Sequence, residues 1–199
     1  MRMEKIFQQK VLSLGYTDYE SRVMIYAVKA ILYEVSKFII LAIFFALQNK
    51  LLHFLVAAAC LMAVRTRSGG IHLKHYISCF LMTFFAFYVS ILLLPAFLHP
   101  SKYGMTAVLV LCMALTYQSG PVLSVSRPKP DGIRIKALKQ ETAVVIGIFA
   151  ILVVLIGENS YLESGFWIIL FQSVQLLIAK AKEVIQDEKI KHHEHEIAG

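Results

Sequence analysis

The sequence predicts an all-α polytopic membrane protein with about six transmembrane helices, an N-terminal amphipathic helix and both termini in the cytoplasm. Three observations lead to this fold class: an apolar composition, a series of long apolar runs, and positive charge gathered in alternate connections. Of the 199 residues, 58% are hydrophobic and 17% are charged, against roughly 45–50% and about 25% in ordinary globular proteins. This composition excludes a soluble domain, a disordered chain, a disulfide-stapled secreted fold and a collagen-like fibre.

Positive charge fixes the predicted orientation. The chain has 20 Lys and Arg against 13 Asp and Glu, which gives a net charge of +7. Apart from Lys37, Lys50 and Lys102, every basic residue lies before the first apolar run, in the second-to-third or fourth-to-fifth connection, or after the sixth run. Because basic connections stay in the cytoplasm, both termini are predicted to be cytoplasmic and the number of spans to be even. The charge therefore orients a membrane domain and gives no support for a nucleic-acid partner.

The N-terminal elements are predicted from helical spacing and a cap. Apolar side chains recur at helical spacing over residues 1–16, so this segment is expected to form an amphipathic helix at the membrane interface or against a partner. Thr17 and Glu20 have the spacing of a capping box and predict the start of the next helix. That helix becomes apolar over 30–47, which is long enough for a first span.

The other spans follow from the remaining apolar runs. The run 51–64 has 14 residues and would measure about 21 Å as a helix, which is short of a full span. It is followed by basic residues and Gly69–Gly70, so it is expected to be a recessed or interrupted helix. The later spans are predicted at 75–98, 103–119, 143–156 and 162–179.

Polar residues inside these spans have two interpretations. Glu34 and Lys37 lie one turn apart on one helical face. They form either a neutralising pair near the cytoplasmic end or a polar wall of a substrate cavity. Gln172, Ser173 and Gln175 are expected to hydrogen-bond another helix or to line a polar interior.

Two basic segments lie outside the spans. Residues 120–139 contain three prolines and five basic residues, and they are predicted to form an extended cytoplasmic loop because proline restricts the residue before it. Residues 180–199 form a charged tail that is expected to be only partly ordered. Its three histidines are interpreted as solvated side chains rather than metal ligands, so neither a metal nor a cofactor is predicted.

The three cysteines form no CxxC motif and predict no disulfide framework. Cys60 and Cys112 lie in apolar runs and are interpreted as packing residues. Cys79 ends the segment 65–79, in which basic side chains, imidazoles and a helix N-terminus can stabilise a thiolate. Cys79 is therefore a candidate nucleophile, and a packing role is the alternative.

Spacing leaves the partner of Cys79 open. On one continuous helix His72 would lie about 10.5 Å from Cys79 along the axis, which is too far for a general base. His75 would lie one turn away, about 6 Å along the axis, so an early helix start favours His75. A helix that begins near His75 would instead let the glycines fold His72 back toward Cys79.

The pattern Arg-x4-Gly-x-His-x6-Cys, filled by Arg65, Gly70, His72 and Cys79, resembles the signature of the accessory gene regulator protein B family. Members of this family are membrane cysteine endopeptidases that process quorum-sensing peptide precursors. The resemblance implies that Cys79 is the nucleophile and His72 its base. Arg65 and Gly70 are then supporting residues, and His75 is a secondary candidate for proton transfer.

The resemblance also implies a reaction for the whole chain, 1–199, as a single membrane peptidase domain. The C-terminal part of a propeptide is released when the remaining part forms an acyl thioester with Cys79. The remaining part then closes into a thiolactone or lactone. The implied site faces the cytoplasm of a bacterial cell membrane. The expected partners are the lipid bilayer and a precursor with an amphipathic N-terminus and an acidic C-terminus. The resemblance and the small number of spans also suggest a homodimer.

Two alternatives stay open. Arg127 and Lys129 of the basic loop either set the topology and meet anionic lipid, or they contact the acidic tail of the precursor. The alternative function is a non-enzymatic small peptide transporter or export subunit, which would move a peptide through a cavity near Glu34 and Lys37.

Overall fold

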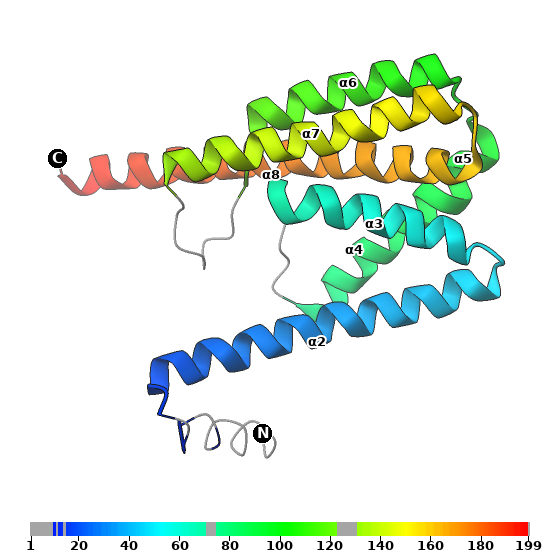
Figure 1. The fold of residues 1–199 in the computed structure, drawn as a ribbon. Helices are drawn as coiled ribbons and strands as arrows, with labels where there is room; N and C mark the ends of the chain where they lie inside the picture. Colours follow the sequence, from blue (N-terminus) through cyan, green and yellow to red (C-terminus); the bar gives the residue numbers. More distant parts are fainter. Residues whose placement is uncertain (1–9, 11, 14, 71–74, 123–130, 199) are drawn as a thin grey trace. The chain divides into compact units, whose positions relative to one another are not determined.

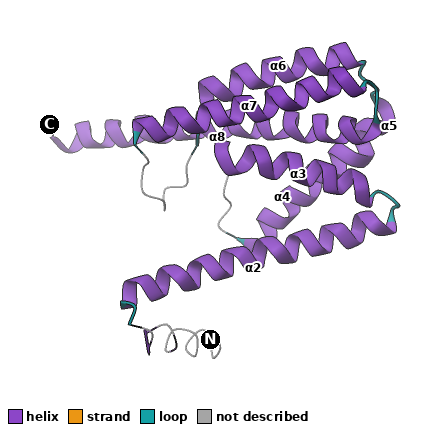
Figure 2. Ribbon diagram, viewed as in Figure 1, coloured by secondary structure: helices purple, strands orange, loops and turns teal. Residues whose placement is uncertain are grey.

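The computed structural model describes residues 10, 12–13, 15–70, 75–122 and 131–198, without side-chain placement for residues 26, 27, 30 and 186–198. All regular structure in these ranges is helical (Figure 2). The chain divides into two compact units, Met1–Gln48 and Asn49–Gly199. The elements are α2 (Asp18–Leu47), α3 (Leu51–Ser68), α4 (Tyr76–Tyr88), the π-helical turn η1 (Val89–Leu93), α5 (Leu94–Phe97), α6 (Lys102–Ser119), α7 (Gly132–Ile156) and α8 (Ser160–Ala198).

The first unit is built around α2. Its predicted capping box is confirmed, because the Thr17 hydroxyl accepts from the Glu20 N–H at 3.3 Å while the Thr17 N–H donates to the Glu20 carboxylate at 2.8 Å. Asp18 in the first turn forms an ion pair with Arg22 at 2.9 Å. The helix then runs without a break to Leu47. The amphipathic helix predicted over 1–16 lies mostly outside the described residues and stays a prediction.

The second unit is a helical bundle with α8 at its centre. Helix α8 packs against α3 and α6, and α7 packs against both α6 and α3 (Figure 1). In its apolar stretch 67% of the residues are buried, against 28–33% in the three other candidate spans. The core joins α3, α6, α7 and α8 through a cluster of apolar side chains: Val64, Met105, Leu109, Ile146, Phe149, Ala150, Val153, Leu162, Phe166, Trp167 and Ile169.

Four helices in the described ranges are long and apolar enough to cross a membrane: Leu51–Ser68, Tyr76–Phe97, Gly132–Ile156 and Ser160–Ile185. Large apolar side chains such as Leu52, Ile77 and Leu155 are exposed on them, as expected for surfaces that face lipid. Helices α2 and α6 lie where the sequence predicts two further spans. The count of six and the orientation of the termini stay predictions.

Three predicted boundaries are wrong. Helix α3 has 18 residues rather than 14, because its basic last turn remains helical, so it is not a shortened helix. Helix α7 already begins at Gly132, since no proline follows Pro130 and the sequence 133–139 consists largely of helix-forming residues. The backbone of the tail 180–199 is helical to Ala198, with an i,i+3 ion pair of Lys180 and Glu183 at 2.9 Å.

Candidate active site

The candidate nucleophile lies at the start of one of the four candidate membrane spans. Helix α4 begins at Tyr76, and its N-cap is His75 with extended backbone (φ −102°, ψ 136°). The N–H of Cys79 donates to the carbonyl of His75 at 3.1 Å, which places Cys79 at the first closed turn. The Cys79 side chain is half-buried. At a helix N-terminus a thiolate is favoured by the partial positive charge of the backbone N–H groups.

The start of α4 narrows the choice between the two histidines. His75 lies before the helix rather than on it, and its side chain is exposed. Because the backbone of His75 is extended, the helical side-chain spacing that would favour His75 as the partner of Cys79 does not apply to it. A helix that begins at Tyr76 meets the condition under which the glycines can bring His72 back toward Cys79. His72 itself lies outside the described residues, so its role as the base stays a prediction.

The glycines form a tight turn at the end of α3. Gly69 has φ 73° and Gly70 has φ 153°, conformations that side chains rarely allow. A Cβ atom on Gly69 would lie 1.9 Å from the carbonyl oxygen of Val122. The N–H of Val122 donates to the carbonyl of Ser68 at 3.0 Å. The sequence indicated a conformational role for Gly70, but it did not indicate that Gly69 lies against the segment that follows α6.

A side chain from α8 holds the same turn. Gln172 is 1% exposed, and its Nε2 donates to the Gly69 carbonyl at 2.9 Å. The sequence predicted a hydrogen bond from Gln172 to another helix or a place in a polar interior. The structure shows that the acceptor is the main chain where α3 ends. The glycine turn within the motif is thus tied to the interior of α8 and to the segment that follows α6.

Arg65 lies in the last turn of α3 and is half-buried. Its carbonyl accepts the N–H of Gly69 at 3.0 Å, which closes the helix. A basic residue at a helix C-terminus also complements the partial negative charge there. Arg65 therefore lies next to the glycine turn, and its supporting role stays a prediction.

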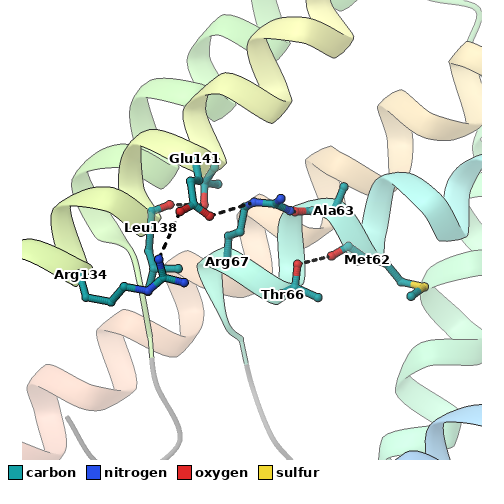
Figure 3. A network of polar contacts seen from close by, with 8 residues as sticks. Met62, Ala63, Thr66, Arg67, Arg134, Leu138 and Glu141 are labelled. Carbon is teal, nitrogen blue, oxygen red and sulfur yellow. Dashed lines mark hydrogen bonds and ion pairs between the residues drawn. The ribbon is translucent and has the colours of Figure 1, made fainter. Parts of the chain in front are cut away.

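A network of charged residues joins the end of α3 to the start of α7 (Figure 3). Glu141 accepts from Arg67 at 3.3 Å and from Arg134 at 3.5 Å. Arg67 also donates to the carbonyl of Ala63 at 2.8 Å. Two connections that the charge distribution assigns to the cytoplasm thus meet around one carboxylate. The sequence did not indicate a role for Glu141, because it does not show which basic residues an acidic side chain in a basic segment contacts.

The other predicted binding candidates belong to the first unit or fall outside the described residues. Glu34 and Lys37 form an ion pair within α2, which fits the interpretation as a neutralising pair. Arg127 and Lys129 fall outside the described residues, so their contact with a precursor tail stays a prediction. In the part of the chain that the structure describes, no group of three or more His, Cys, Asp or Glu residues is arranged to hold a metal ion.

Comparison with known proteins gives two matches. A sequence model described as "Accessory gene regulator B" matches residues 3–176. A protein of Clostridium beijerinckii described as AgrB-like is 28% identical over 164 residues, which cover 82% of this chain and 80% of the relative. No solved structure gives a significant match.

Proposed function

Because the chain belongs to the accessory gene regulator B family, we propose that it is a membrane cysteine endopeptidase that cleaves a quorum-sensing propeptide and promotes its cyclisation. Family membership and the membrane-spanning helices connect the chain to the processing of an autoinducing peptide at a membrane. The identity of the nucleophile, its base and the ring chemistry are parts of the proposal. The observation that carries the proposal is the position of Cys79, the last residue of the motif, at the start of α4.

The surroundings of the three thiols favour Cys79. Cys112 is 2% exposed and lies in α6 among the core helices, and Cys60 packs against the core cluster from α3. Cys60 is half-buried like Cys79, but its sulfur lies against α8, because a Cβ atom on Gly165 would be only 3.1 Å from it. Cys79 is half-buried, lies close to the N-terminus of α4 and is not part of the core cluster.

The reaction follows from thiol chemistry. The Sγ atom of Cys79 attacks the carbonyl carbon at the processing site, and His72 takes the thiol proton. The C–N bond breaks, His72 gives the proton to the leaving amine, and the N-terminal part stays as an acyl thioester on Cys79. A thiol or hydroxyl inside that peptide then attacks the thioester, closes the ring and returns the Cys79 thiol. A site that excludes water favours this closure over hydrolysis.

The charge network supports a site that faces the cytoplasm. Arg67 and Arg134 meet around Glu141 at the end of the bundle where α3 ends, and Lys139 donates to the carbonyl of Gln118 at the end of α6. Basic residues remain on the cytoplasmic side of a membrane. A newly made precursor with an acidic tail would reach this end first.

Cleavage in cells tests the proposal. The chain is co-expressed with a precursor that has an amphipathic N-terminus, a central Cys or Ser and an acidic tail, and the products are identified by mass spectrometry. Cys79→Ala is expected to abolish release of the C-terminal part at unchanged membrane abundance. Cys60→Ala is the matched control and is expected to retain cleavage. Normal cleavage by Cys79→Ala would overturn the peptidase and leave the non-enzymatic peptide transporter, which needs no thiol.

A further inference from the structure

Gln172 is an unusual residue for the middle of an apolar span. Its side chain is buried, with 1% exposure, and its Nε2 hydrogen-bonds the carbonyl of Gly69, which is 103 residues away in the sequence. Its Oε1 is also buried and has no hydrogen-bond partner among the described residues. A half-satisfied amide in an apolar interior is costly, so packing alone does not account for it.

The group that Gln172 holds is the most freely rotating part of the motif segment. Two consecutive glycines have more backbone freedom than any other pair of residues. The hydrogen bond to the Gly69 carbonyl fixes the plane of the peptide that joins Gly69 to Gly70. A Cβ atom on Gly70 would lie 3.3 Å from Gln172 Nε2, so the amide lies directly against both residues. The bond also comes from α8, the most buried of the candidate spans.

We propose that Gln172 is a positioning residue of the active site, which fixes the direction in which the chain leaves the Gly69–Gly70 turn toward His72. His72 follows Gly70 by two residues, so a rotation of the Gly69 peptide would redirect the segment that carries the base. A base is effective only within hydrogen-bond reach of its proton donor, and small displacements of a catalytic group cost large factors in rate. This inference rests on the proposed function, in which His72 acts on Cys79.

The reactivity of Cys79 toward iodoacetamide tests the inference without a precursor. In the full-length protein, Cys60→Ala and Cys112→Ala leave Cys79 as the sole thiol. The alkylation rate is measured against pH for this background and for the same background with His72→Ala, Gln172→Met or Ser173→Ala. Gln172→Met keeps the volume but removes the donor to Gly69. Ser173→Ala is the matched control, because the Ser173 hydroxyl donates to Ile169 of its own helix.

The expected result is a common shift in two variants. His72→Ala and Gln172→Met should both move the pH profile of alkylation in the same direction, toward higher pH, and by a similar extent. A shift of one pH unit would slow alkylation about tenfold below the midpoint, in proportion to the thiolate fraction. Ser173→Ala should leave the profile in place. If Gln172→Met does not accumulate in the membrane, the shorter Gln172→Asn is measured in the same way.

Each other outcome has a defined consequence. A profile that moves with His72→Ala but not with Gln172→Met overturns the positioning role and leaves the proposed function intact. A profile that moves with Gln172→Met but not with His72→Ala also overturns it, because the effect would not pass through His72. If neither variant moves the profile, the pairing of His72 with Cys79 fails, and the inference fails with it.

Discussion

Helices α3 and α7 end in nearly the same way, yet only one of the two ends belongs to the candidate site. Gly69 caps α3 with φ 73° and ψ −148°, and Gly157 caps α7 with φ 82° and ψ −152°. Each N–H returns to the carbonyl four residues earlier at 3.0 Å. A Cβ atom on Gly157 would meet nothing within 4 Å, whereas one on Gly69 would lie 1.9 Å from the Val122 oxygen.

The two helix ends differ in why they require glycine: at Gly157 only the backbone conformation requires it, and at Gly69 a tertiary contact requires it as well. Both caps use backbone angles that only glycine adopts without strain, and this is enough to end a helix. At Gly69 the same angles also bring the chain against Val122 and place its carbonyl under Gln172. A common helix ending therefore has a second role at Gly69, where contacts with two other parts of the bundle fix the backbone just before Gly70 and His72 of the motif.

Gly69→Ala is expected to have the largest effect. It combines backbone strain with a clash against main chain that has no side-chain freedom to yield, so we expect a loss of about 3 kcal/mol or more. Precursor cleavage should be lost as well, because the turn toward His72 would be displaced. Thermal unfolding in detergent and the cleavage assay measure the two effects. Wild-type cleavage by a stably folded Gly69→Ala protein would contradict the role given to this turn.

Gly157→Ala is the matched variant at the other helix end. It carries the backbone strain without the clash, so we expect a loss of about 1–3 kcal/mol in the free energy of unfolding. Cleavage per molecule of folded protein should be retained, because the connection from α7 to α8 is not part of the motif segment. The same two assays apply. Equal losses of cleavage in Gly157→Ala and Gly69→Ala would contradict the inference that only the Gly69 helix end is needed for activity.

Glu141→Gln removes the charged contact between the end of α3 and the start of α7. The side chains of Glu141 and Arg67 are 41% and 36% exposed, so solvent screens the pair and we expect a loss of about 0.5–1 kcal/mol. Glu183→Gln, which breaks the exposed pair with Lys180, is the control and should lose less. The difference in thermal stability should shrink at high salt. A salt-independent difference would indicate packing rather than charge.

Local sequence signals predicted the helices better than the contacts between them. Apolar runs located the helices, and the spacing of Thr17 and Glu20 gave the start of α2, because both depend on neighbours in the sequence. Proline spacing overestimated the loop before α7, since the restriction acts only on the preceding residue. The motif marked Cys79 and Gly70. It could not indicate that Gly69 lies against Val122, because that contact depends on how the bundle packs.

The cap of α2 gives the smallest and most local effect. The backbone N–H and the hydroxyl of Thr17 bond the Glu20 carboxylate, and these bonds hold its pKa below the ordinary value of 4.5. A lowered pKa means that the ionised cap stabilises the helix start above the unfolded-state value, and that this contribution is lost as the pH falls through the folded-state value. Protection factors from hydrogen exchange in the first turn of α2 should therefore fall as the pH is lowered below the ordinary Glu value of 4.5. Glu20→Gln should remove this pH dependence. The amides around Gly69 are the control, because in the described structure no carboxylate accepts a hydrogen bond from them, and their protection should stay the same in both proteins. An unchanged pH dependence in Glu20→Gln would assign the effect to another acid, with Asp18 of the same turn the first to test.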